Sequence, residues 1–294
     1  MKNILLTIAY DGTEFCGWQR QPGQRSVQGE VERALSQVCG QPIQIHGTSR
    51  TDAGVHALGQ RASFAADFRI PVEKIPVAVN GLLAVTEKSR GRNHGGDVAL
   101  LDAVEMPEDF HARFAAAGKK YTYQIRNSSS PEPFLRNYRY HIYKTLNVKA
   151  MKQAAAFVAG THDFKCFQAA GGKVMESTVR TVYGIRVSAT GDSGVTSDSW
   201  SAVDFKSSAA EGCDIRLEII GDGFLYNMVR IIAGTLVDVG LGRKQPYEIR
   251  DIIEGKDRRR AGHTAPPQGL YLTEIFFEKD RLLEAAAALE TQED

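Results

Sequence analysis

The segment from His46 to Gln60 has the residue types of a catalytic loop. It contains one carboxylate, one guanidinium, two imidazoles and three glycines, and Asp52 lies at its centre, two residues after Arg50. A carboxylate can act as a nucleophile or as a general base, arginine presents a planar fork of donors, and glycine lets the backbone approach a ligand closely. An aspartate followed by Ala-Gly is also an ordinary turn former. The spacing alone leaves both interpretations open.

Two further positions carry chemistry that would suit such a carboxylate. Tyr121 and Tyr123 alternate in a strand-like segment, so both rings should point to the same face. Arg230 precedes an apolar helix over 231–237. There it could offset the effect of burial on a carboxylate, or extend its charge into solvent. The histidines of the Asp52 segment are more typical of hydrogen-bonding loop members, and no spacing indicates a metal site.

The elements that position Asp52 can be predicted from local patterns. Residues 3–9 form an apolar run that predicts a buried strand. Ser26 is placed to cap a helix that stops at Gly40. Residues 41–46 and 60–66 are predicted as strands, which would hold the Asp52 loop between sheet elements.

The remaining elements follow in two groups. A helix over 72–83, an insertion over 89–96, a strand over 98–105 and a link at 110–114 complete the first half. In the second half we expect strands over 120–126, 178–189 and 202–206, and a helix capped by Asn147 that runs to Ala159. Ser-, Gly- and Asp-rich stretches near 191–212 predict surface insertions.

An internal similarity predicts two related halves. Residues 6–12 and 217–223 align without gaps, each a strand ending in Asp-Gly. This favours an α+β fold with two halves of mainly antiparallel sheet and helices on one face. We place the halves at 1–113, with the Asp52 loop, and 114–294, with Tyr121 and Arg230, and expect a ligand groove between them.

Composition limits the function classes. The chain has 294 residues, 43% of them hydrophobic, a net charge of +1 and four widely spaced cysteines. It lacks an apolar run of membrane-spanning length, so we expect a cytoplasmic protein with reduced thiols and no membrane contact. RNA binding would require segregated charge. The candidate clusters are Arg20 with Arg25, Arg50 with Arg61, Arg90 with Arg92, Lys119 with Lys120, and Arg258 to Arg260.

Several ordered motifs extend the pattern beyond the Asp52 loop. They are Arg50-Thr-Asp-Ala-Gly-Val-His-Ala57, Tyr10-Asp-Gly-Thr13, Phe15-Cys-Gly-Trp-Gln-Arg-Gln21, Asp109-Phe-His-Ala-Arg-Phe114, Lys120-Tyr-Thr-Tyr123, Gly160-Thr-His-Asp-Phe164, Phe224-Leu-Tyr-Asn-Met-Val-Arg230 and Gly269-Leu-Tyr-Leu272. Together they resemble the tRNA pseudouridine synthase A (TruA) family from about residue 5 to about residue 277.

The resemblance implies a pseudouridine-synthase-like fold and a cofactor-free isomerase. The implied substrates are uridines 38, 39 and 40 in the tRNA anticodon stem-loop, and the implied assembly is a homodimer. In this family Asp52 would lie beside the sugar and Arg230 would keep it ionised. Tyr121 would stack on the uracil and remove the C5 proton, Arg50 would hold the base out of the stem, and Leu270 would form an apolar wall.

Two alternatives to catalysis of this kind have different requirements. A non-catalytic RNA-binding protein of the same fold would lack Asp52, Tyr121 or Arg230, and all three are present. A hydrolase would need a second carboxylate or a phosphate-binding Gly-Lys motif, and neither is convincing here. One departure from the family is Ser49 in place of the usual glycine, which raises a question about the local backbone because serine tolerates positive φ poorly.

Overall fold

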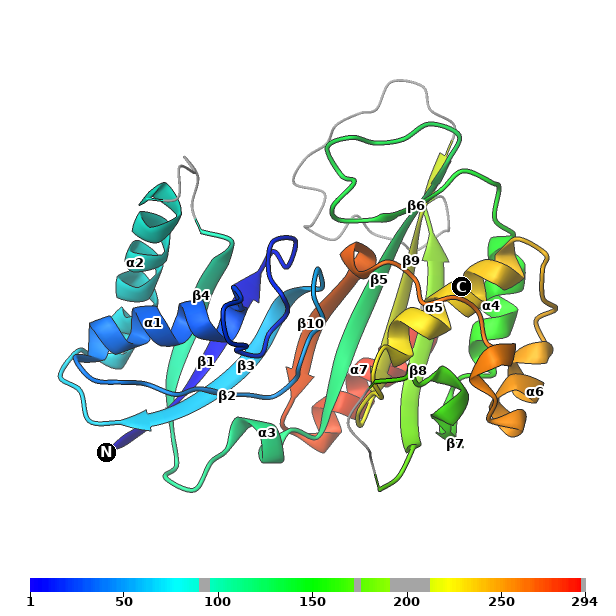
Figure 1. Ribbon diagram of the computed structural model, residues 1–294. Coiled ribbons are helices and arrows are strands. Elements are labelled where there is room, and N and C mark those ends of the chain that lie inside the picture. Colours follow the sequence, from blue (N-terminus) through cyan, green and yellow to red (C-terminus); the bar gives the residue numbers. More distant parts are fainter. Residues whose placement is uncertain (90–95, 172–175, 191–211, 292–294) are drawn as a thin grey trace. The chain divides into compact units, whose positions relative to one another are not determined.

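The computed structural model describes residues 1–89, 96–171, 176–190 and 212–291 (Figure 1). The expected strand over 202–206 and most of the insertions near 89–96 and 191–212 lie outside the described residues. The chain divides into two compact units. Unit 1 comprises Met1–Ala117 and Tyr271–Phe277, and unit 2 comprises Gly118–Leu270 and Glu278–Asp294.

Unit 1 is built on a sheet with the strand order β4-β1-β3-β10. Its strands are β1 (Lys2–Tyr10), β2 (His46–Gly47), β3 (His56–Ala66), β4 (Val98–Met106) and β10 (Leu270–Phe276). β1 pairs antiparallel with β3 and with β4, whereas β10 runs parallel to β3 with Tyr271 opposite His56. β1 is therefore a central strand, and its side chains Ile4, Leu6 and Ile8 are fully buried.

Helices α1 (Val27–Cys39) and α2 (Ile75–Ser89) lie side by side in unit 1 (Figure 1), and the short α3 (Ala112–Ala115) follows β4. The predicted caps of α1 are confirmed. The Ser26 side chain accepts a hydrogen bond from the Gly29 amide, and Gly40 ends the helix in the left-handed conformation with φ of 70°.

Two predictions for unit 1 need correction. Of the expected strand over 41–46, only His46 pairs with a neighbouring strand, as the first residue of β2. The amides of Ile43 and Ile45 instead donate to the Ser36 and Glu32 side chains of α1, so they do not form a ladder. The helix expected over 72–83 begins with a 3-10 turn (Val72–Lys74) and extends to Ser89. Pro76 lies in its first turn, where a missing amide costs no hydrogen bond.

In unit 2 the strands follow the order β5-β9-β8-β7, and their pairing is mainly antiparallel. Its strands are β5 (Gly118–Ser128), β6 (Tyr140–Ile142), β7 (Gly160–Asp163), β8 (Val179–Ala189) and β9 (Gly212–Gly221), with β6 parallel to β5. Its helices are α4 (Val148–Ala156), α5 (Met228–Gly240), α6 (Glu248–Gly255) and α7 (Lys279–Thr291). Asn147 caps α4 as predicted, but the helix ends at Ala156 rather than Ala159.

The helices of unit 2 cover both faces of β5. A Cβ on Gly118 would meet Leu282 of α7, whereas Tyr123 lies close enough to Arg230 of α5 for their charges to interact. Successive side chains of a strand point to opposite faces, so positions 118 and 123 face opposite sides. α5 and α7 therefore pack on different faces of the strand. From the sequence, helices are expected on one face only, and α7 is an additional helix on the opposite face.

The internal similarity corresponds to equivalent places in the two units. β1 lies between β3 and β4, and β9 lies between β5 and β8, in each case with antiparallel neighbours. Both strands run into the Asp-Gly pair that marks the similarity, Asp11-Gly12 after β1 and Asp222-Gly223 after β9. The two units thus share a central strand and its turn.

The unit boundaries differ from the expected division after Arg113. The first continuous segment of unit 1 runs to Ala117, and residues 271–277, expected in the second half, belong to unit 1 because β10 pairs with β3. No helix among the described residues is long and apolar enough to cross a membrane.

Candidate active site

The loop that carries Asp52 is held by hydrogen bonds to Tyr10 and Trp18, near the start of the chain. The hydroxyl groups of Tyr10 and Thr51 hydrogen-bond at 2.7 Å, and the Trp18 amide donates to the Thr51 carbonyl at 3.0 Å. The Val55 amide donates to the Asp52 carbonyl at 3.1 Å, closing a turn that begins at Asp52. Asp52 is half-buried. Its backbone position is therefore fixed before any ligand is bound.

Two glycines allow this close approach. A Cβ on Gly12 would lie 2.0 Å from the Val55 carbonyl oxygen, and one on Gly17 would lie 2.6 Å from the Thr51 carbonyl oxygen. Gly17 also has φ of 105°, a conformation that side chains rarely adopt. The Tyr10 and Trp18 motifs are thus the support of the Asp52 loop.

His56 is a structural member of the same loop, as the sequence favoured. It is 2% exposed, and its Nδ1 accepts a hydrogen bond from the Gly12 amide at 3.1 Å. Its ring stacks on Tyr271 of β10 with 4.7 Å between ring centroids. These contacts account for His56 as an anchor between β3, β10 and the turn after β1.

Ser49 fits its position without strain. The Gln60 side chain donates to the Ser49 carbonyl at 2.7 Å and accepts from its amide at 3.3 Å. Among the described residues other than glycine, only Asn227 and Lys256 have positive φ. The serine in place of the family's glycine therefore leaves the Asp52 loop intact, and the adjacent Arg50 is exposed.

In unit 2, Tyr121 and Tyr123 occupy alternating positions of β5 but differ in environment. Tyr121 is 6% exposed and meets Phe224 edge to face, with ring centroids 5.2 Å apart. The Tyr123 hydroxyl donates to the Pro266 carbonyl at 2.7 Å. Burial raises the pKa of Tyr123 well above 10, against the lowering effect of Arg230. Tyr123 therefore has a supporting role, whereas Tyr121 remains the candidate for chemistry.

Arg230 lies in the first turn of α5, and its guanidinium group is fixed by two hydrogen bonds. Nε donates to the Ala265 carbonyl at 2.7 Å, and Nη1 donates to Asn227 Oδ1 at 2.8 Å. The Ala265 amide donates in turn to the Arg230 carbonyl at 3.1 Å. A side chain that merely extended its charge into solvent would not need these partners, so the geometry favours a positioned cation.

Leu270 begins β10 and is 6% exposed. It follows the 3-10 turn Pro267–Gly269, in which a Cβ on Gly269 would lie 2.7 Å from the Tyr123 ring. Unit 2 thus brings Tyr123, Arg230 and the segment before Leu270 together, and unit 1 brings Arg50 and Asp52 together.

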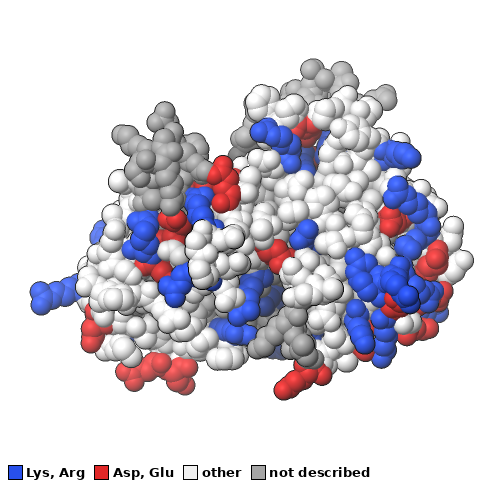
Figure 2. All heavy atoms as spheres, in the orientation of Figure 1, with Lys and Arg blue, Asp and Glu red and all other residues white. Residues whose placement is uncertain are grey.

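Several side chains of the remaining basic clusters make hydrogen bonds or ion pairs within the protein. Figure 2 shows lysine and arginine side chains near α6 with acidic side chains among them. There Arg259 pairs with Asp257 at 2.7 Å, while Arg258 and Arg260 donate to the carbonyls of Gly262 and Asp251.

Lys120 and Arg61 also interact with acidic side chains of their own units. Lys120 Nζ lies 2.8 Å from Glu218, which Arg186 also contacts. Burial alone would raise the pKa of Glu218, but these two cations hold it below its usual value. Burial lowers the pKa of Arg61, and Asp102 and Glu274 act against that effect. Arg90 and Arg92 lie outside the described residues.

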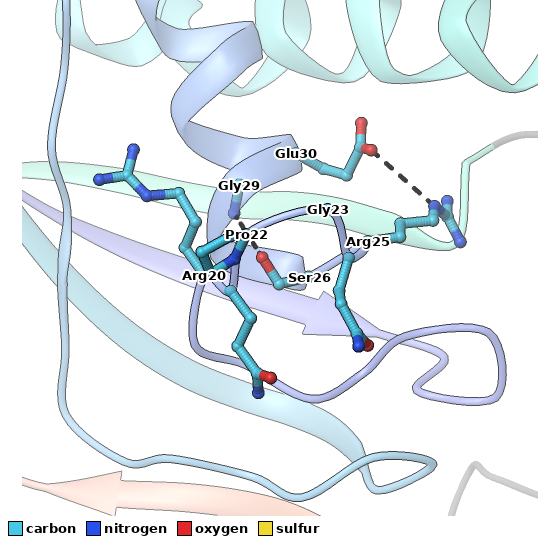
Figure 3. Close-up of a pocket in the computed structure, with 9 residues that line it drawn as sticks. Arg20, Pro22, Gly23, Arg25, Ser26, Gly29 and Glu30 are labelled. Carbon is cyan, nitrogen blue, oxygen red and sulfur yellow. Dashed lines mark hydrogen bonds and ion pairs between the residues drawn. The ribbon is translucent and has the colours of Figure 1, made fainter.

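A hollow of about 410 Å³ lies beside the start of α1 (Figure 3). Its cations have nearby acidic partners. Arg25 lies 2.9 Å from Asp97 and 3.9 Å from Glu30, and Arg20 lies 3.2 Å from Glu32. The two arginines expected to contact RNA thus have part of their charge offset by carboxylates.

A second hollow in unit 1, of about 380 Å³, was not predicted from the sequence. It is lined by Arg50, Trp18, His46, His111 and Phe114, among others. The sequence signal for this hollow is the motif from Asp109 to Phe114, which supplies His111, Arg113 and Phe114 to its lining. In the described part of the chain, no group of three or more histidine, cysteine or acidic residues could hold a metal ion.

Comparison with known proteins shows the family. Residues 6–115 and 154–278 match the tRNA pseudouridine synthase family. The chain is 44% identical over 277 residues to tRNA pseudouridine synthase A of Ruminiclostridium cellulolyticum, a match that covers 94% of this chain and 100% of the relative. The corresponding enzyme of Caldicellulosiruptor bescii is 41% identical over the same shares of both chains. The chain therefore belongs to the tRNA pseudouridine synthase family.

Proposed function

We propose that this chain isomerises uridine to pseudouridine at positions 38, 39 and 40 of tRNA, with Asp52 as the catalytic carboxylate. Family membership makes it an isomerase that acts on tRNA, and the anticodon stem-loop as the target is part of this proposal. The observation that carries the role of Asp52 is its fixed, half-buried loop, which is bonded through Thr51 to Tyr10 and Trp18. A loop whose backbone is held in advance needs little reorganisation when the substrate arrives.

The reaction rearranges one nucleoside without gaining or losing atoms. The bond between N1 and C1′ breaks, the uracil turns, and C5 joins C1′ while the C5 proton moves to N1 or solvent. Asp52 would either attack C1′ as a nucleophile or remove a proton from the sugar as a base. Because no atom is supplied from outside, the proposal requires no cofactor.

Each of the other site residues has a proposed role. Arg230 would keep Asp52 ionised, since a neighbouring cation opposes the rise in pKa that burial causes. Tyr121 would stack on the target uracil and accept its C5 proton. Arg50, exposed two residues before Asp52, would hold the flipped nucleotide out of the stem, and Leu270 would form an apolar wall beside the base.

The support for these roles differs between residues. Arg230 has a guanidinium group fixed by Ala265 and Asn227, and Tyr121 has a ring oriented by Phe224. A non-catalytic RNA-binding protein of the same fold would have no need for Asp52, Tyr121 and Arg230 together. Their joint presence favours the enzyme.

The assembly and cellular location belong to the same proposal. We expect a homodimer that holds tRNA across both subunits, in the cytoplasm where tRNA is modified. Sedimentation of the purified protein with and without tRNA tests the dimer, and cell fractionation tests the location.

The direct test is to incubate the purified protein with unmodified tRNA transcripts in the presence of a metal chelator. Pseudouridine should form at positions 38, 39 and 40, as mapped by site-specific chemical labelling. tRNA from cells with and without the protein provides the matched comparison. Absence of the product, or product only at other uridines, would contradict the proposal.

A further inference from the structure

The hollow beside Arg50 contains a cluster of aromatic rings that the proposed chemistry does not use. His46 on β2 and His111 before α3 have ring centroids 5.0 Å apart, and those of His111 and Phe114 are 4.5 Å apart. Phe114 is 79% exposed. We call His46, His111 and Phe114, together with Arg113 in the same hollow, the ring cluster.

The ring cluster is anchored to the sheet of unit 1. His46 is paired opposite Ser63 of β3, and the Ser63 hydroxyl accepts a hydrogen bond from the Ala112 amide at 3.0 Å. The Thr48 hydroxyl donates to the Ala112 carbonyl at 3.2 Å. His111 Nδ1 accepts from the Arg113 amide at 3.2 Å, which fixes the ring at the start of α3. The rings therefore stand on a rigid base.

The charge of this hollow differs from that of the hollow near α1. Its described lining includes Arg50, Arg113 and two histidines and no carboxylate. The hollow in Figure 3 contains Glu30, with Arg25 close to it. Burial, His46 and Arg113 lower the pKa of His111, so its ring is neutral near pH 7 and offers a flat stacking face.

We propose that the ring cluster binds one unpaired nucleotide of the tRNA, with its base stacked on Phe114 and its phosphate near Arg113 and Arg50. This inference rests on the proposed function, because it takes tRNA as the ligand. Proteins recognise single-stranded RNA by stacking splayed bases on aromatic rings and by contacting phosphates with arginine. Gln19 and Gln44 line the same hollow and offer amide groups for a base edge or a 2′-hydroxyl.

The test measures tRNA affinity in an Asp52→Asn background, so that binding is recorded without turnover. Phe114→Ala should raise the Kd about 5- to 150-fold, the range expected for loss of one base stack. Phe114→Trp should stay within about threefold of the parent, because it keeps a stacking face. Phe134→Ala is the matched control, since Phe134 is also 79% exposed but lies in unit 2.

Arg113→Gln separates the phosphate contact from the stack. It should reduce the slope of log Kd against log salt by about one phosphate contact, whereas Phe114→Ala should leave that slope unchanged. An equal loss of affinity in Phe114→Ala and Phe134→Ala would overturn the proposal. So would dissociation of a dimer by Phe114→Ala, which would make the ring cluster a protein interface.

A crosslinking experiment identifies the nucleotide. Placing the photoreactive residue benzoylphenylalanine at position 114 should give one major adduct on an unpaired nucleotide of the tRNA, and adducts scattered along the molecule would contradict the inference. These readouts do not depend on product formation. If the unsubstituted chain binds tRNA but makes no pseudouridine, the proposed function fails while the ring cluster is still tested.

Discussion

The hydroxyl groups of Tyr10 and Thr51 lie 2.7 Å apart, which ties the end of β1 to the residue immediately before Asp52. The contact joins residues far apart in the chain, and the Trp18 amide also donates to the Thr51 carbonyl. The central strand of unit 1 thus sets the backbone position of the loop that carries the proposed catalytic carboxylate.

Asp52→Asn should abolish pseudouridine formation while preserving the fold and the affinity for tRNA. The amide is nearly isosteric but serves neither as a nucleophile nor as a base. Single-turnover assays with mapped product should give less than about 1% of the unsubstituted rate. Asp67→Asn, at a carboxylate 88% exposed, is the control that should react normally. Turnover well above that limit would exclude Asp52 as the catalytic group.

Tyr121→Phe should slow the reaction, whereas Tyr123→Phe should lower the stability of the protein. The first keeps the ring that stacks on the base but removes the hydroxyl, so tRNA should bind while the rearrangement stalls before C5 deprotonation. The second removes the donor to the Pro266 carbonyl and should lower the free energy of unfolding by about 1 kcal/mol. Denaturant melts and turnover per folded molecule distinguish the two, and a normal rate for Tyr121→Phe would leave its ring with a stacking role alone.

Arg230→Leu should slow turnover far more than it weakens tRNA binding. It would leave a carboxylate without its proposed cation and remove the hydrogen bonds to Ala265 and Asn227. Arg230→Lys keeps the charge without the two-point geometry and should recover only part of the rate. A normal rate for Arg230→Leu would show that Arg230 only stabilises the structure through its hydrogen bond to Ala265.

The sequence predicted most elements near the site because their signals are local. Ser26 and Gly40 cap α1 as their residue types require, and the strand after Asp52 and the strand that carries Tyr121 follow from their apolar patterns. The prediction of a strand over 41–46 was wrong because amides of this segment donate hydrogen bonds to the side chains of Ser36 and Glu32 on α1. Such tertiary partners cannot be inferred from the local spacing of apolar residues.

The residues of the candidate site could be predicted from the sequence, but their tertiary contacts could not. Asp52, Tyr121 and Arg230 stand in distinctive motifs, whereas the difference between Tyr121 and Tyr123 depends on Phe224 and Pro266, which are remote in the sequence. The pairing of Lys120 with Glu218 likewise could not be inferred from a lysine in an alternating strand.

Replacing Arg258, Arg259 and Arg260 with glutamine should leave the salt dependence of tRNA binding nearly unchanged. Arg259 pairs with Asp257, and Arg258 donates to the Gly262 carbonyl, so these groups stabilise the turn after α6. Affinity measured between low and moderate salt gives the slope. A fall in slope by two or three contacts would instead place the run on the RNA path, as the sequence suggested.

Glu218→Gln should destabilise unit 2 at neutral pH and much less in acid. Lys120 and Arg186 hold the pKa of Glu218 below its value of 4.5 in an unfolded chain, despite its burial. The carboxylate therefore contributes its full stabilisation above that value, and the contribution is lost as the pH falls through the lower folded pKa. Unfolding at pH 7 should show a loss of about 3 kcal/mol. A loss equally large at pH 3 would contradict this ion-pair origin.

The parallel pairing of β10 with β3 links the Asp52 loop to the order in which the chain is made on the ribosome. His56, close behind Asp52, obtains its stacking partner Tyr271 only after residues up to β10 have been translated. Until then the nascent unit 1 lacks the strand that pairs with β3 at His56 and Ala57, and this open stretch is a template for aberrant strand addition. The proposed catalytic loop is therefore encoded early but completed late, so a nascent chain that stops before β10 carries Asp52 without its finished support.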